Sequence, residues 1–152
     1  MTVSGVGTFA YEAPSAEQLA QAEGWVAGFA ARWDRPDGES LRDLMHPDTQ
    51  NLIPPMERPG NAQEVIDHFK ELVARVPGFR LEVQRWAPVG DSVLIEWAGH
   101  AAIGGRNLTW HGVDRVSLRD GKTYEGQAYW DTRAVSEMIL EALTAAQDKP
   151  SR

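Results

Sequence analysis

The architecture is set by residues 92–130, whose sequence is SVLIEWAGHAAIGGRNLTWHGVDRVSLRDGKTYEGQAYW. Apolar and polar side chains alternate with a period of two through much of this stretch, as they do in strands with one buried face. Two dipeptides that favour tight turns, Gly104-Gly105 and Asp120-Gly121, interrupt the alternation. We therefore predict three antiparallel strands, at residues 92–103, 106–118 and 122–131.

The first turn determines how the first two of these strands pair. A two-residue loop at Gly104-Gly105 places Trp97 opposite Gly112 and Ile95 opposite Asp114. Residues opposite one another point to the same face of a sheet. Trp97 and Asp114 are therefore expected on one face.

The second turn can close in two ways. A two-residue loop would mix apolar and polar side chains on one face, which strand pairing disfavours. A three-residue loop, Arg119-Asp120-Gly121 with its glycine left-handed, shifts the register by one. It places Asp114 opposite Gly126, and on the other face Arg115 opposite Glu125. We predict the three-residue loop.

The predicted register gathers small and aromatic residues on the face that must meet the helices. That face holds Ile95, Trp97, Gly99, Trp110, Gly112, Asp114, Val116, Tyr124, Gly126, Ala128 and Trp130. A packed core would normally place Val, Ile or Leu where the glycines stand. We predict a mostly apolar cavity here, floored by small residues, walled by aromatic rings and holding one carboxylate. In the alternative, helical side chains such as Phe29 and Phe69 fill the space.

Helices are predicted before and after this meander. Capping boxes at Ser15 with Gln18 and at Asn61 with Glu64 begin two of them, and apolar residues at three- to four-residue spacing follow. The remaining predicted elements are a short helix at 39–46, a proline-rich loop after it, a strand at 79–87 and a last helix at 132–146. This order predicts an α+β fold with helices on one face of a curved sheet.

Composition bounds the function. The chain has 152 residues, 42% hydrophobic and 24% charged, which fits one globular domain, expected at 15–147 with a loose arm at 1–14 and a tail at 148–152. A net charge of −7 argues against a nucleic-acid partner. No apolar run approaches the ~20 residues of a membrane span, and residues 1–14 lack the features of a secretory signal. The absence of cysteine excludes a thiolate nucleophile and fits a cytoplasmic location. No nucleotide-binding motif is present, so we expect no cofactor.

Several short pieces, in order, resemble the nuclear-transport-factor-2-like superfamily in its SnoaL-like branch, over about residues 15–140. They are Leu44-Met45-His46-Pro47-Asp48, Ile95-Glu96-Trp97, Gly112-Val113-Asp114-Arg115, and Asp120-Gly121-Lys122 ahead of Ala128-Tyr129-Trp130-Asp131. The resemblance implies a conical barrel (a cystatin-like α+β roll), in which helices pack on the concave face of a curved antiparallel or mixed sheet around a pocket. It also implies a homodimer through the outer sheet face. The family includes ketosteroid isomerases, polyketide cyclases, limonene-type epoxide hydrolases, dehydratases and non-catalytic binders.

Transferring the relatives' catalytic residues onto this sequence gives a mixed result. Asp114 stands where ketosteroid isomerases keep a protonated oxyanion-hole aspartate. Their general base falls near Ile53 and their tyrosine near Phe29, so both are missing. Asp34, at the end of the first predicted helix, resembles the aspartate of the dehydratases.

The epoxide hydrolases and polyketide cyclases give a similar result. The arginine and two aspartates of the epoxide hydrolases fall on Trp97, Gly99 and Ala128, while Asn51 matches their water-holding asparagine. The acid–base aspartate of the polyketide cyclases also falls near Ala128. No catalytic set is complete.

Asp114 is the leading catalytic candidate. Desolvation among Trp97, Trp110 and Val116 is expected to raise its pKa, which would make it a general acid or base near neutral pH. The alternative is a structural role, bonded to a buried amide or to Tyr124.

Other candidates are weaker, and each has a structural alternative. Asp34 could point into the cavity mouth, or could only end the first helix. His68 could reach the cavity as a second titratable group, or could be a half-buried structural histidine. The predicted ligand-binding residues are Trp97, Trp110, Trp130, Tyr124, Phe29 and Asn51. His100 and His111, with Glu96 and Glu125, belong to the predicted outer face together with Val113, Arg115, Gln127 and Tyr129. We interpret this face as polar or dimeric and expect no metal.

Three functions are compatible with these observations. The first is a cofactor-independent acid–base enzyme (isomerase, cyclase, dehydratase or epoxide hydrolase) acting on an apolar, ring-containing molecule of polyketide, terpenoid or steroid type. The second is a small-molecule-binding protein with the same pocket and no chemistry. The third is a dimeric interaction module with a sealed core.

Overall fold

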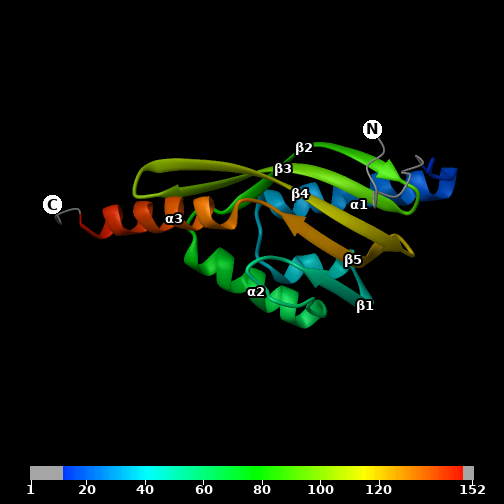
Figure 1. The fold of residues 1–152 in the computed structure, drawn as a ribbon, viewed down its shortest axis with the longest axis horizontal. Coiled ribbons are helices and arrows are strands. Elements are labelled where there is room, and N and C mark those ends of the chain that lie inside the picture. The colour runs from blue at the N-terminus through cyan, green and yellow to red at the C-terminus, as the bar shows by residue number, and fades with distance from the viewer. Residues whose placement is uncertain (1–11, 149–152) are drawn as a thin grey trace, which may run out of the picture.

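The structure is a computed structural model that describes residues 12–148, so most of the predicted arm and tail lies outside the described residues. Figure 1 shows the arrangement of the elements. In chain order they are α1 (Ala16–Asp34), the 3-10 helix η1 (Glu39–Leu44), β1 (Met45–Leu52), α2 (Ala62–Arg75), β2 (Arg80–Val89), β3 (Ser92–Ile103), β4 (Arg106–Arg119), β5 (Lys122–Tyr129) and α3 (Thr132–Gln147).

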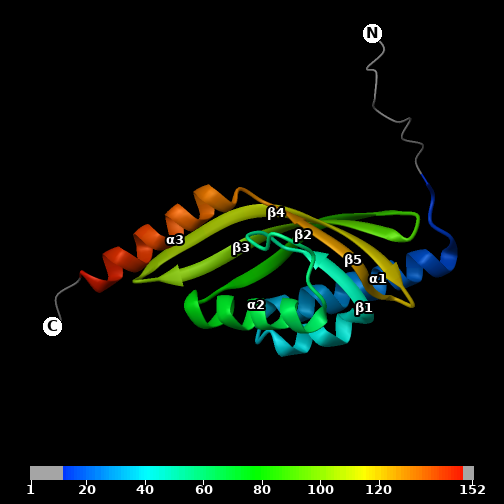
Figure 2. The same ribbon diagram turned by 60° about the horizontal axis from the view of Figure 1, so that its bottom comes forward.

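The five strands form one curved sheet in the order β1-β5-β4-β3-β2. β1 runs parallel to β5, and the other neighbours are antiparallel, so the sheet is mixed. Helices α1 and α2 lie together against one side of the sheet, while α3 runs along the far end of the β3–β4 hairpin (Figures 1 and 2). The predicted α+β class, with a curved mixed sheet and helices packed on it, is confirmed.

Both predicted capping boxes are present at the helix starts. Ser15 and Gln18 exchange backbone-to-side-chain hydrogen bonds of 2.8 and 3.1 Å, and Asn61 and Glu64 exchange bonds of 2.9 and 3.0 Å. Each pair satisfies two backbone N–H groups that a helix start leaves free. Among the described residues, no helix combines the length and apolar character that crossing a membrane requires.

The segment Met45–Leu52 is a strand, where we predicted the end of a short helix and a loop. Its inward side chains, Thr49 and Asn51, are buried and polar, so the strand lacks the apolar alternation that would have revealed it. Pro47 is tolerated because β1 lies at the edge of the sheet. Asn51 therefore belongs to a strand and not to a loop.

The predicted register of β3 and β4 is confirmed. Trp97 pairs with Gly112 and Ile95 with Asp114, closed by the two-residue turn at Gly104-Gly105.

The predicted three-residue loop between β4 and β5 is wrong. Arg119 pairs with Lys122, so the loop has two residues, and both are left-handed: Asp120 has φ 54 and Gly121 φ 71. The register then shifts in β5, where Tyr124 has no partner in β4.

This bulge changes the strand partners without exchanging the two faces. Asp114 pairs with Ala128 rather than with Gly126, a shift of two residues from the prediction. Arg115 pairs with Gln127, but its guanidinium still lies 3.5 Å from the Glu125 carboxylate. Small and aromatic residues therefore lie on the inner face as predicted, although the turn that joins β4 to β5 differs from the predicted one.

We predicted that the three inner-face glycines, Gly99, Gly112 and Gly126, form the floor of an empty space. This prediction is wrong, because a side chain covers each of them. A Cβ at Gly99 would overlap the indole of Trp110, and one at Gly112 would overlap that of Trp97. Because the rings lie flat across neighbouring strands, only glycine fits beneath them. Gly126 has the same role under the Asn51 amide.

Candidate functional site

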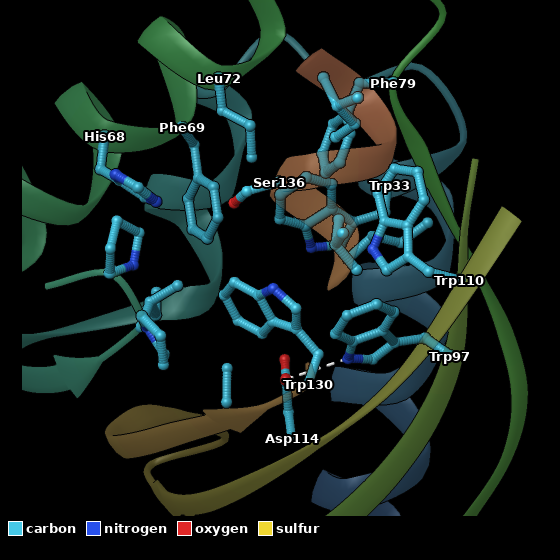
Figure 3. Close-up of a pocket in the computed structure, with 17 residues that line it drawn as sticks. Trp33, His68, Phe69, Leu72, Phe79, Trp97, Trp110, Asp114, Trp130 and Ser136 are labelled. Atoms are coloured by element: carbon cyan, nitrogen blue, oxygen red, sulfur yellow. Dashed lines mark hydrogen bonds between the residues drawn. The ribbon is translucent and has the colours of Figure 1, made fainter. Parts of the chain in front are cut away.

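A cavity of about 160 Å³ lies between the sheet, α2 and α3, and Figure 3 shows the side chains around it. Three of its lining residues are polar: Asp114, His68 and Ser136. The others are Trp33, Ile53, Pro54, Pro55, Phe69, Leu72, Phe79, Leu81, Trp97, Trp110, Ala128, Trp130, Val135 and Ile139. Pro55 and Ser136 are exposed, so the cavity reaches the surface beside them.

Aromatic rings hold one another in place along the wall. The rings of Trp97 and Trp130 meet at 60° with their centroids 6.1 Å apart. Trp110 stacks on Phe79 at 5.9 Å, and Trp33 meets Phe79 edge-on at 5.8 Å. Such interlocked rings offer a preformed apolar surface to a planar ligand.

Asp114 carries the only carboxyl group among the residues that line this cavity. Its Oδ1 accepts a 3.0 Å hydrogen bond from the indole N–H of Trp97, its one hydrogen-bond partner within residues 12–148. Burial raises the pKa of Asp114 to about 7, because desolvation outweighs the lowering effect of the Trp97 bond. The side chain keeps some accessible surface, which we assign to the cavity that it lines.

This environment gives Asp114 two chemical options. With a pKa near 7, both the carboxylate and the neutral acid are populated near neutral pH. Oδ2 makes no hydrogen bond to the described part of the chain and is available to a ligand. The group can therefore accept or donate a proton at the cavity wall.

His68 is the second titratable group at the cavity. It lies on α2, half-buried beside Phe69, at a ring distance of 5.5 Å. Desolvation lowers its pKa, and the carboxylate of Glu71 opposes that effect. The imidazole is therefore largely neutral at pH 7, and it shares no hydrogen bond with Asp114.

A smaller cavity, of about 60 Å³, also has Asp114 in its lining. Asn51 and Thr123 are its other polar residues, and Phe29 is one of its apolar ones. Asn51 donates to the Thr49 hydroxyl at 2.9 Å. At about 30 Å³ per water molecule, this space has room for one or two waters.

Comparison with known proteins shows where the chain belongs. The sequence pattern of the SnoaL-like domain matches residues 26–126, two thirds of the chain. The chain belongs to the SnoaL-like domain family. No curated protein matches it.

Solved structures share the fold of this SnoaL-like chain at low identity. TerC, co-crystallized with polyporic acid, is 23% identical with a TM-score of 0.67, over 79% of this chain and 98% of TerC. IdmH, a putative polyketide cyclase from Streptomyces antibioticus, is 20% identical with a TM-score of 0.69, over 82% and 99%. An LEH-like epoxide hydrolase of M. tuberculosis is 19% identical with a TM-score of 0.65, over 83% of this chain and 94% of that one. These similarities establish the fold only; any activity has to be argued from the residues of the site.

The site of this SnoaL-like domain brings together only some of the predicted residues. Asp114, His68, Trp97, Trp110 and Trp130 line the larger cavity. Phe29 and Asn51 line the smaller one.

Asp34 and Tyr124 lie in neither cavity. Asp34 is exposed at the end of α1, where the chain leaves the helix. The bulge in β5 displaces Tyr124, whose ring lies under the Arg119 guanidinium at 3.6 Å and against His46 at 5.6 Å. We correct the prediction that these two residues serve the pocket.

The two outer-face histidines do not form a shared site. His100 lies 3.2 Å from the Thr109 hydroxyl and 3.3 Å from the Glu82 carboxylate. Within residues 12–148, no group of three or more His, Asp or Glu side chains is arranged to hold a metal ion.

Several cavity residues on the helices and loops were not predicted from the sequence. Trp33, Phe79, Val135 and Ile139 are the main ones. Trp33 belongs to the apolar stripe of α1, but a stripe does not reveal which part of the sheet it faces.

Proposed function

We propose that this SnoaL-like domain is a cofactor-independent acid–base enzyme acting on a ring-containing, largely apolar small molecule. The observation that carries the proposal is the Asp114 carboxyl, whose pKa is raised to about 7 on the wall of an apolar cavity. Perturbed carboxyl groups of this kind in a cavity are candidates for proton transfer.

The proposed roles follow from the contacts. Asp114 moves the proton, using the oxygen that Trp97 does not bind. Trp97 is a positioning residue, because its N–H holds the other carboxyl oxygen at 3.0 Å. The rings of Trp110 and Trp130, which border the cavity in Figure 3, contact the ligand from the sides.

The size of the cavity limits the ligand. A dry cavity of roughly 150 Å³ takes up benzene, and this one measures about 160 Å³. It therefore admits about one ring, and a larger ligand would extend toward the mouth at Pro55 and Ser136. The names of the neighbours, a polyketide cyclase and an epoxide hydrolase among them, support a small organic substrate.

A carboxylate base can be tested with 5-nitrobenzisoxazole, a small two-ring compound. Removal of its C–H proton by the carboxylate breaks the ring N–O bond and yields a nitrile and a coloured phenolate. We expect turnover that rises with pH around 7 and falls by about 100-fold or more in Asp114→Asn. The control is Asp34→Asn, which removes an exposed carboxyl outside the cavity and should keep full activity. Equal turnover by Asp114→Asn and the wild type would reject the proposal.

A non-catalytic binding function is the second candidate. It is favoured by the separation of Asp114 from His68, which share no hydrogen bond and therefore form no ready acid–base pair. Calorimetric binding of 5-nitrobenzisoxazole without turnover at pH 8, with equal affinity in Asp114→Asn, would support this function instead.

A further inference from the structure

Three indole N–H groups around the cavity have no hydrogen-bond partner in the described part of the chain. Trp25 donates to the Thr123 hydroxyl at 2.9 Å and Trp97 to Asp114 at 3.0 Å. Trp33, Trp110 and Trp130 line the larger cavity, but their indole nitrogens make no hydrogen bond within residues 12–148.

Two of these three indoles are buried, and a buried N–H group normally has an acceptor. Trp33 is 2% exposed and Trp110 is 9% exposed. An N–H group that is buried without an acceptor destabilises a protein by the full cost of its desolvation, so such groups are rare.

The free indole nitrogens are not sealed in the core. Across the described residues, His100 Nε2 is the one sealed side-chain nitrogen or oxygen that makes no hydrogen bond, although it lies 3.3 Å from the Glu82 carboxylate. The nitrogens of Trp33 and Trp110 therefore retain accessible surface, and the space that both residues line is the cavity. In Figure 3 the nitrogen atoms of Trp33, Trp110 and Trp130 face the region enclosed by the rings.

We propose that these three indoles form a donor set for oxygen atoms of the ligand. An indole N–H only donates, so it selects an acceptor and offers nothing to a hydrocarbon edge. The ligand class is therefore a ring compound that carries carbonyl, enolate or phenolate oxygens, and not an unoxygenated hydrocarbon skeleton. This inference rests on the proposed function only in taking the cavity as the ligand site.

The donor set complements Asp114 chemically. Neutral N–H donors in a cavity that excludes water stabilise negative charge that develops on an oxygen. If Asp114 removes a proton from the carbon next to a carbonyl group, the electron pair moves to the carbonyl oxygen, where the indoles would hold it. The proton returns from the neutral carboxyl of Asp114, so the step needs no co-reactant.

The test compares two bicyclic probes of nearly equal size, 1-indanone with its ketone oxygen and indane without it. Dissociation constants are measured by calorimetry for the wild type and for Trp33→Phe, Trp110→Phe and Trp130→Phe, each of which removes the N–H and keeps an aromatic ring. We expect at least one of these variants to weaken 1-indanone binding by about fivefold or more, as the loss of a hydrogen bond does. Indane binding should change less than twofold.

The matched control is Trp86→Phe, the same exchange at a half-buried indole outside the cavity lining. It should leave both dissociation constants unchanged. The proposal is overturned if the wild type fails to bind 1-indanone, or if all three cavity variants weaken the two probes equally.

A measurement on the unmodified protein covers the case in which a buried variant fails to fold. In ¹H–¹⁵N spectra, 1-indanone should move the indole N–H signal of one or more of Trp33, Trp110 and Trp130 downfield. The Trp25 and Trp86 signals should stay in place. No downfield movement in any of the three would also overturn the proposal.

The outcome is separable from that of the proposed function. Selective binding of 1-indanone without 5-nitrobenzisoxazole turnover would retain the donor set and remove the catalytic role of Asp114. Turnover that depends on Asp114, with no preference for the ketone, would do the reverse.

Discussion

The indole N–H of Trp97 donates to Asp114 Oδ1 at 3.0 Å, from one strand to its neighbour in the sheet. The bond favours the ionised carboxyl, whereas burial favours the neutral form. Burial has the larger effect, which leaves the pKa of Asp114 at about 7. Two opposing effects in one pair of residues thus set the protonation state at the cavity wall.

Removing the Trp97 donor should raise the pKa of Asp114 further. In Trp97→Phe the desolvating ring remains and the hydrogen bond that lowers the pKa is lost. The inflection of a pH–rate profile, or of a carboxyl ¹³C titration, should therefore move to higher pH. Trp86→Phe, away from the cavity, serves as the control. A pKa that is unchanged or lower in Trp97→Phe would contradict this account.

Asp114 should also make stability depend on pH. Its pKa is raised from 3.8 in the unfolded chain to about 7 in the folded protein, so its contribution is fully present below about pH 4 and is lost as the pH rises through 7. At 1.36 kcal/mol per pH unit, the loss between pH 5 and pH 8 is at most about 3 kcal/mol. The free energy of unfolding in urea is measured for the wild type and for Asp114→Asn at both pH values. We expect the free energy of unfolding of Asp114→Asn, relative to that of the wild type, to be higher at pH 8 than at pH 5. An equal difference between the two proteins at both pH values would refute this dependence on Asp114.

The glycines under the tryptophans should be intolerant of a side chain. Gly112→Ala would place a methyl group against the Trp97 indole, and the resulting overpacking should destabilise the protein by about 1–3 kcal/mol. Gly24→Ala is the matched control, because a Cβ at that helical position meets nothing within 4 Å. The control should stabilise the protein by up to about 1 kcal/mol. Equal stability of Gly112→Ala and the wild type, by urea unfolding, would show that the ring moves freely.

The sequence predicted the inner face of the sheet because side-chain alternation survives an error of two residues in register. Asp114 and Ala128 were placed on the same face although the second turn was misassigned. The bulge at Tyr124 was not predicted, because the two-residue turn was judged with a regular ladder, which would have mixed polar and apolar side chains on one face; one extra residue in β5 removes that mismatch.

Two other features depended on contacts distant in the chain. The polar strand β1 acquires its structure by pairing with β5 and burying Asn51 over Gly126, which local sequence does not record. The glycines were recognised as unusual, but their cause is the Trp97 and Trp110 rings on the neighbouring strands rather than an open floor. A one-dimensional pattern shows that something approaches a glycine closely and does not show what it is.

The outer face of the sheet should hold two copies of the chain together. Leu94, Val113 and Tyr129 are 41%, 37% and 53% exposed on adjacent strands, and Val113 pairs directly with Tyr129. Val113→Glu would set a second carboxylate opposite Glu96, which is its partner in β3. In sedimentation experiments we expect the wild type as a dimer and this variant shifted toward the 16.8 kDa monomer. Leu140→Glu, at a 65% exposed position on α3, controls for adding a charge and should stay dimeric. A monomeric wild type, or a dimer that Val113→Glu leaves intact, would show that this face is not the interface.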